Sequence, residues 1–128
     1  MKRDMDYVRN LLVKIEAAPT AIENSSELLD PAATEQEVEK LSYHLGMLID
    51  QVPFVSGISI GDDDGEAWVD LKLTWHGHEF LEKVRDPEVW SRTMAGAKKA
   101  GNFGLEFVGD LAKAYAKHIA KERLGIDF

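Results

Sequence analysis

The chain has 128 residues, a net charge of −8, a hydrophobic fraction of 45% and no cysteine. This length predicts one domain that buries roughly two-thirds of its unfolded surface, and the lack of cysteine excludes disulfides and thiolate-held metal sites. The N-terminal MKRDMDYVRN places acids where a signal peptide has its apolar segment, and no run approaches the ~18 apolar residues of a membrane span. We therefore expect a cytoplasmic protein with no membrane attachment.

The charge is spread unevenly along the chain. Residues 22–90 hold sixteen acids and four bases, whereas residues 91–128 hold seven bases and four acids. Affinity for duplex DNA comes largely from cations that displace counterions from phosphates. The central part of the chain is therefore poorly suited to DNA, and any basic surface is expected near the C-terminus.

The N-terminal third predicts a helix, a short strand and one further helical turn. Apolar residues recur at three- and four-residue steps from Asp4 to Ala17, and Pro19 ends the helix. Residues 20–23 are expected to form a short strand. Residues 25–30 allow at most a helical turn, capped by Ser25 or Ser26.

The central helix is predicted from Glu35 to Gln51, with Thr34 as its N-cap. Its 3-4-3-4 apolar spacing predicts a buried face, and its opposite side is expected to face a partner or DNA. The residues expected on the buried face are Val38, Leu41, Leu45, Leu48 and Val52. The candidates for the partner-facing or DNA-facing side are Lys40, Tyr43, His44 and Met47.

A β-hairpin follows the helix, with strands over residues 54–60 and 67–73 and a turn of sequence GDDDGE. Trp68, Trp75 and Trp90 are expected to join the hairpin to the helices as core residues. Strand alternation also allows Trp68 to point outward, where it would act as an interface anchor.

Three helices complete the chain over residues 74–85, 86–100 and 104–124, and Trp75 is expected to help pack the first of them. Asp86 caps the second helix with Pro87 at its first position, and Gly101 and Gly125 end the last two. A basic patch of Lys113, Lys117 and Lys121 lies along one face of the last helix.

The sequence predicts no metal site, no cofactor, no small-molecule substrate and no catalytic centre. His76 and His78 are two apart on a predicted helix and point about 200° apart, so they cannot share a metal. We expect His78 to be hydrogen-bonded near the core. The acidic segment 62–66 lacks EF-hand spacing, and P-loop, G-x-S-x-G and H-E-x-x-H motifs are absent. The chain is not expected to be an enzyme.

Three stretches carry a resemblance to a known family: MKRDMDYVRNLLVKIE, LSYHLGMLID and LTWHGHEFLEKVRDPEVW. Together they resemble the bacterial and phage family called domain of unknown function 2513. SYHLGMLID and LT-x-x-G also resemble segments of winged-helix transcription regulators. The resemblance implies a winged-helix-like fold and carries no established catalytic residues. The chain differs from winged-helix regulators in two features. Only residues 25–30 can supply the second helix, and no glycine turns the central helix into the hairpin.

We therefore predict an α+β fold in a single domain, residues 1–128. A winged-helix-like module over 1–73 is followed by three C-terminal helices over 74–128 that pack on it. The predicted function is binding to a protein partner or to a second copy, in a regulatory or prophage-linked role. The alternative is a winged-helix DNA-binding transcriptional regulator.

Overall fold

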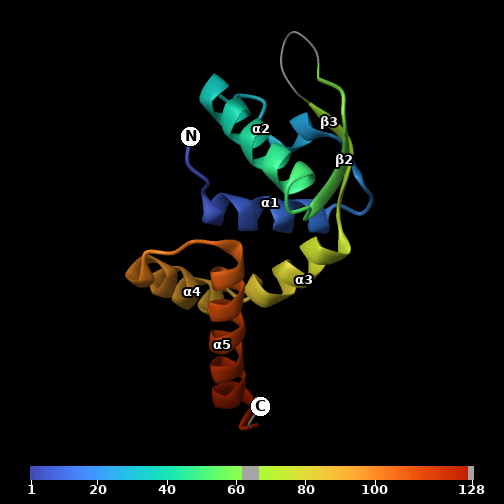
Figure 1. Ribbon diagram of the computed structural model, residues 1–128. Coiled ribbons are helices and arrows are strands. Elements are labelled where there is room, and N and C mark those ends of the chain that lie inside the picture. The colour runs from blue at the N-terminus through green and yellow to red at the C-terminus, as the bar shows by residue number, and fades with distance from the viewer. Residues whose placement is uncertain (62–66, 127–128) are drawn as a thin grey trace. The chain divides into compact units, whose positions relative to one another are not determined.

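The computed structural model describes residues 1–61 and 67–126 (Figure 1). The described residues form helices and a three-stranded antiparallel sheet, which confirms the predicted α+β class. The chain forms two compact units, Met1–His78 and Glu79–Phe128, and each is described by itself below. That the C-terminal helices pack on the N-terminal module as one domain stays a prediction.

The first unit begins with α1 (Met5–Ala17), whose N-cap Asp4 accepts a hydrogen bond from the Tyr7 N–H. Strand β1 (Ile22–Asn24) leads into a single 3₁₀ turn, η1 (Ser25–Leu28). The predicted cap of this turn was wrong, because the Asn24 side chain caps it. The Ser25 hydroxyl is instead buried and accepts from the Trp68 N–H at 3.1 Å.

Helix α2 (Glu35–Asp50) begins where predicted, with the Thr34 hydroxyl accepting from the Glu37 N–H. Leu41, Leu45 and Leu48 form the buried side that the apolar spacing predicted. The helix ends at Asp50, one residue before the predicted end, and the N–H of the C-cap residue Gln51 donates to the Met47 carbonyl. The chain then turns directly into the hairpin.

The sheet has the order β1-β3-β2, so β3 (Trp68–Leu73) lies between β1 and β2 (Val55–Ser59). Its register shifts by one residue, so that Asp70 and Leu71 together oppose Gly57 in a β-bulge. Asp70 has a φ of 57°, in the left-handed region that Asp tolerates better than most residues. The bulge changes the alternation of β3, so Trp68 and Leu71 both point into the core. The predicted acidic turn 62–66 lies outside the described residues.

Helix α3 (Trp75–Val84) starts at a close contact with the hairpin. The Thr74 hydroxyl donates to the Pro53 carbonyl at 2.8 Å and accepts from the Gly77 N–H at 3.0 Å. A Cβ on Gly77 would lie 2.1 Å from the Phe54 carbonyl oxygen. Only glycine fits at residue 77 without moving the backbone.

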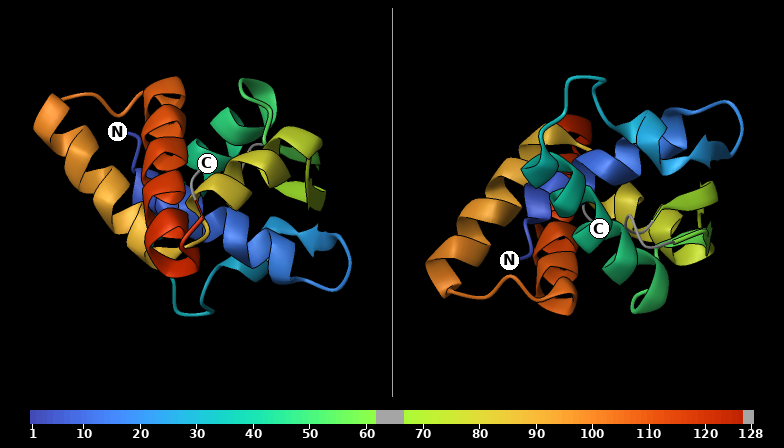
Figure 2. Two further views of the ribbon diagram at one scale, coloured as in Figure 1. Left: turned by 90° about the horizontal axis from the view of Figure 1, so that it is seen from below. Right: turned by 90° about the horizontal axis from the view of Figure 1, so that it is seen from above.

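The second unit is built on α4 (Pro87–Ala100) and α5 (Leu105–Leu124), which pack against each other as a helical hairpin (Figure 2). The Asp86 side chain caps α4 as predicted, and Gly101 and Gly125 end the two helices at φ values of 70° and 68°. The core residues on these two helices are Val89, Trp90, Thr93, Ala97, Val108, Ala112 and Ile119. Arg123 reaches back from the last turn of α5 to Asp86 at 2.6 Å.

Candidate functional site

The central feature of the first unit is His44, which is fully buried on α2. Its Nδ1 donates to the Lys40 carbonyl at 2.7 Å, and its Nε2 accepts from the Asp4 N–H at 3.0 Å. The imidazole thus ties the start of α1 to the middle of α2. The prediction that His44 faces a partner was wrong, because the α1 N-terminus covers this side of α2.

Lys40 takes part in the same contact. Its ammonium lies 2.9 Å from a carboxylate oxygen of Asp4 and 4.6 Å from the centre of the Tyr7 ring. The ammonium lowers the pKa of Asp4 below 3.8, helped by the Tyr7 N–H and opposed by partial burial. Burial, together with the charges of Glu37 and Asp4, raises the pKa of Tyr7 above 10.0. Lys40 is therefore already occupied by groups of its own chain.

Two tyrosines enclose the histidine. The Tyr7 ring centre lies 4.8 Å from that of His44, and the Tyr43 ring meets His44 edge-on at 5.3 Å. Such tilted and edge-on geometries are the favourable ones for aromatic pairs. Tyr43 still exposes 38% of its surface, so it both supports the cluster and reaches solvent.

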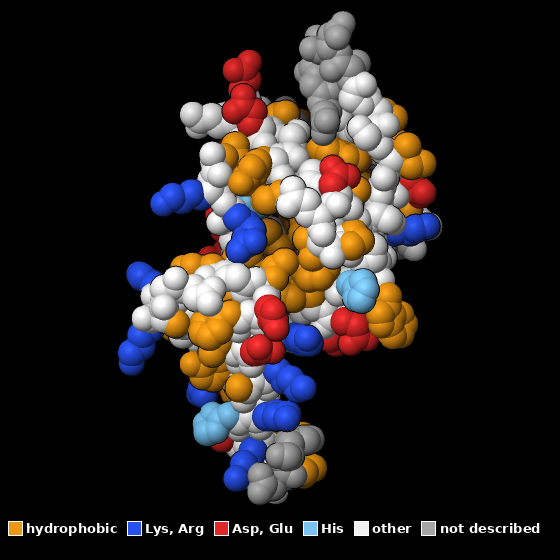
Figure 3. Space-filling model, viewed as in Figure 1, with side chains coloured by type: hydrophobic (Ala, Val, Ile, Leu, Met, Phe, Trp, Pro, Cys, Tyr) orange, Lys and Arg blue, Asp and Glu red, His pale blue; other side chains and the backbone are white. Residues whose placement is uncertain are grey.

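The solvent-exposed side of α2 is acidic and differs from the predicted one. Val38 is 43% exposed, so its place on the predicted buried face was wrong, and Met47 is only half-buried. The first turn of α2 is exposed to solvent, unlike His44, which the α1 N-terminus covers. The exposed residues of α2 are Glu35, Gln36, Glu37, Val38, Glu39, Tyr43 and Asp50. Figure 3 shows acidic side chains over the N-terminal end of α2.

Trp68 and Trp90 are buried, as predicted for core residues, whereas Trp75 is not. Trp68 is 2% exposed, so it is not an outward interface anchor, because the bulge at Asp70 turns it inward. Trp75 was expected to pack α3, yet it is 77% exposed at the start of that helix. On the edge strand β2 and just beyond it, Ile58 and Ile60 are exposed as well. The first unit thus presents apolar side chains at several separate places.

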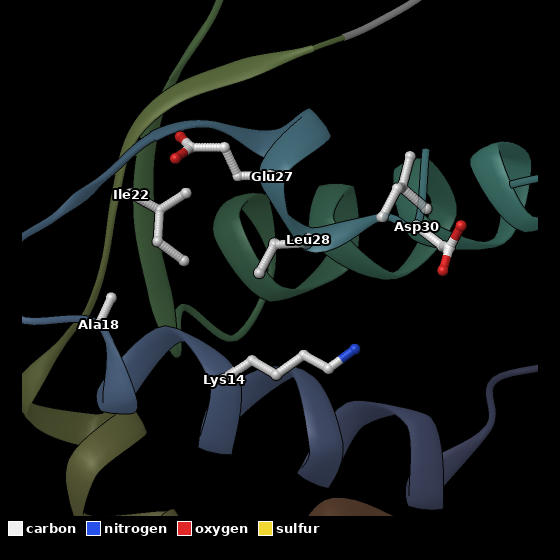
Figure 4. A pocket seen from close by; sticks show the side chains of 7 residues that line it. Lys14, Ala18, Ile22, Glu27, Leu28 and Asp30 are labelled. Atoms are coloured by element: carbon white, nitrogen blue, oxygen red, sulfur yellow. The ribbon is translucent and has the colours of Figure 1, made fainter. Parts of the chain in front are cut away.

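A hollow of about 500 Å³ opens between the end of α1 and the turn η1. Figure 4 shows Lys14 reaching from α1 along one wall, with Ile22 and Leu28 opposite. Glu27 and Asp30 at its rim accept from the backbone N–H groups of Asn24 and Ala32, at 2.9 and 2.8 Å. Their carboxylates therefore stabilise the local turns. Lys14 is the charged side chain of the hollow that has no such partner among the described residues.

The second unit brings a further lysine to the predicted basic patch. Lys83 of α3 joins Lys113 and Lys117 of α5 around an open hollow of about 270 Å³, whose floor is formed by Ala116 and Ala120. Among the described residues, no carboxylate lies within ion-pair distance of any of these three lysines. Figure 3 shows basic side chains along α5.

The arginines of this unit behave differently from its lysines. Arg85, Arg92 and Arg123 are paired with Glu82, Glu88 and Asp86, at 2.6 to 2.8 Å. Sequence reasoning identified Lys113 and Lys117 but missed Lys83, because it lies on another helix and thirty residues away. Lys121, the third predicted residue of the patch, is exposed and does not line the hollow.

The histidines of α3 do not form a metal site. His76 is exposed, and the Nδ1 of His78 lies 3.7 Å from a carboxylate oxygen of Glu16. His78 is itself half-exposed, so its predicted place near the core was wrong. Within residues 1–61 and 67–126, no group of three or more His, Asp or Glu side chains is arranged to hold a metal ion. No helix in this part of the chain is both long and apolar enough to span a membrane.

Fold and site define a small α+β protein whose two conspicuous surfaces are an acidic helix face and a lysine-rimmed hollow. The family described as "Hypothetical protein (DUF2513)" matches residues 2–103, and the chain belongs to this family. A relative described as "Uncharacterized protein", from Haemophilus influenzae, is 29% identical over 124 residues, which are 97% of this chain and 99% of the relative. No solved structure matches the chain significantly.

The cluster around His44 joins two of the stretches that carry the family resemblance. Asp4 and Tyr7 belong to the N-terminal stretch, and Lys40 and His44 belong to or precede LSYHLGMLID. Sequence reasoning missed Asp4 and Tyr7 as partners of α2. Their presence in a shared stretch was the available signal, since helix periodicity says nothing about a contact between the end of one helix and the side of another.

Proposed function

We propose that this protein acts by binding a basic protein surface through the exposed face of α2, in a cytoplasmic regulatory, prophage-linked role. The observation that carries this proposal is the composition of that face, where Glu35, Glu37 and Glu39 surround the exposed Val38. An apolar residue within like charges is typical of an interface centre with a charged rim.

The order of elements supports a winged-helix-like frame for this surface. The succession α1, β1, η1, α2, β2, β3 and the sheet order β1-β3-β2 place α2 directly before a hairpin, as in a winged helix. The single 3₁₀ turn η1 occupies the position where such a module has its second helix. In this proposal the helix position that reads DNA in other winged-helix proteins contacts a protein instead.

The same helix is a poor surface for DNA. Its one base, Lys40, is paired with Asp4, and His44 is buried. The remaining exposed face carries carboxylates, which repel phosphates. The alternative of a DNA-binding regulator gains support only from the second unit, where Lys83, Lys113 and Lys117 gather without ion-pair partners among the described residues.

The test is a pair of fluorescence anisotropy titrations at about 50 mM salt, one with a lysine-rich peptide and one with random duplex DNA. We expect the peptide to bind and the double variant Glu35→Gln/Glu39→Gln to weaken it severalfold. The control Glu23→Gln/Asp70→Asn removes the same charge from the sheet of the first unit and is expected to bind as wild type.

Two outcomes would contradict the proposal. Equal weakening by the α2 variant and by the control would mean that only net charge is being measured. Sub-micromolar affinity for the duplex, with a steep salt dependence that Lys113→Glu removes, would establish the DNA-binding alternative.

A further inference from the structure

Two helix surfaces of this chain carry the same pattern with opposite charge. On α2, the exposed residues Glu35, Val38 and Glu39 stand at positions i, i+3 and i+4. On α5, Lys113, Ala116 and Lys117 stand at the same spacing along the hollow. Residues three and four apart are neighbours on a helix surface, so each triplet forms one continuous patch.

The two patches also match in relief. Val38 projects from α2 with 43% of its surface exposed, whereas Ala116 and Ala120 form the floor of an open hollow. Burial of a valine side chain against alanines removes apolar surface from water, while the glutamates meet the lysines around it. Neither patch is explained by the folding of a single chain, since Val38 stays exposed and Lys83, Lys113 and Lys117 have no carboxylate partner among the described residues.

Resting on the proposed binding role of α2, we propose that its partner is a second copy of this chain. The acidic patch of one copy docks in the lysine-rimmed hollow of the next, so the contact is head-to-tail. A contact of this kind uses different surfaces on the two copies and leaves one of each free, and it therefore builds short chains or closed rings. The hollow of about 270 Å³ makes the contact small, so it is reversible and depends on salt.

The experiment is sedimentation of the full chain over a range of concentrations at low and high salt. We expect the average mass at about 50 mM salt to rise with concentration above the 14.3 kDa of one chain, and association to weaken about tenfold near 0.5 M salt. The variants Glu35→Lys/Glu39→Lys and Lys113→Glu/Lys117→Glu should each remain monomeric. The chain that carries all four reversals should associate again, because both charges are exchanged.

The control Lys98→Glu/Lys99→Glu makes the same charge change at the end of α4 and should sediment as wild type. Circular dichroism checks that each variant is folded, and Lys113→Gln/Lys117→Gln replaces the reversal if that variant unfolds. A wild-type chain that stays at 14.3 kDa at every concentration would overturn the inference. So would association that the lysine reversal leaves unchanged, or a folded four-residue variant that stays monomeric.

The peptide titration separates this inference from the function on which it rests. Peptide binding that depends on α2, together with sedimentation that ignores Lys113 and Lys117, refutes the second copy as partner and leaves the proposed function intact. If the peptide does not bind through α2 and the chain does not associate, the proposed function itself is refuted.

Discussion

The two units use their polar residues in opposite ways. The first holds fifteen acids and six bases, and its Lys40 and His44 are occupied by the α1 N-terminus. The second holds nine bases and eight acids, and three of its lysines face solvent around a hollow. The difference shows that residue type alone does not identify a working surface. In the first unit Lys40 and His44 bond to groups of another segment, whereas Lys83, Lys113 and Lys117 of the second have no carboxylate partner among the described residues.

The largest expected effect is the loss of folding stability when the buried Trp68 of the first unit is removed. Trp68→Ala removes a buried indole and should lower the free energy of unfolding by about 3–5 kcal/mol. Trp75→Ala, on the exposed start of α3, should change it by less than about 0.5 kcal/mol. Urea unfolding of both variants provides the measurement. Equal destabilisation by the two changes would contradict the assignment of Trp68 to the core and Trp75 to the surface.

A second pair of variants compares glycines across the units. Gly77→Ala places a Cβ 2.1 Å from the Phe54 carbonyl oxygen and should destabilise by about 1–3 kcal/mol or more. Gly109→Ala on α5 meets nothing within 4 Å and should stabilise by about 0.5–1 kcal/mol through helix propensity. Thermal unfolding should therefore move in opposite directions, and a stabilised Gly77→Ala variant would refute the close contact between α3 and the hairpin.

The histidines provide a third comparison. His44→Phe keeps the volume of the ring but leaves the Asp4 N–H without its acceptor, at a cost of about 1–3 kcal/mol. His118→Phe on α5 loses only an exposed contact with Glu122, worth about 0.3–0.5 kcal/mol. Chemical denaturation decides between them, and a neutral His44→Phe would mean that α1 docks on α2 without this hydrogen bond.

The smallest expected effect is a shift in the pKa of single carboxyl groups, measured by acid titration. Lys40 lowers the folded pKa of Asp4 below 3.8, so Asp4 contributes stability above that pH and loses it as the pH falls through the folded value. Lys40→Met should raise the Asp4 midpoint in a carboxyl NMR titration. In the second unit, Arg123→Gln should do the same for Asp86, whose pKa Arg123 lowers. An Asp4 midpoint at or above 3.8 in the wild type would argue against the pair with Lys40.

The sequence predicted the elements better than it predicted the site, for identifiable reasons. The caps Thr34 and Asp86, and the glycines at 101 and 125, mark helix ends through local chemistry that needs no tertiary information. The hairpin followed from strand alternation and turn residues, and the lysines of α5 followed from their spacing.

The errors came from contacts between distant segments. His44 was assigned to the surface because a helix pattern does not reveal that α1 covers it through a backbone N–H. Simple alternation allowed Trp68 to point outward, and it failed because one extra residue in β3 changes the alternation. Val38 fits the apolar spacing but lies in the first turn of α2, where the described structure leaves it open to solvent.

The hydrogen bond from the Asp4 N–H to His44 has a practical consequence. Amide hydrogens at a helix N-cap normally exchange quickly with water, because they have no partner within the helix. At Asp4 the exchange rate should be slow for as long as the amide donates its hydrogen bond to the imidazole, and should rise when α1 separates from α2. This one amide therefore serves as a built-in reporter. A change in its exchange rate upon partner binding would show that binding at the exposed face of α2 alters the contact between α1 and α2.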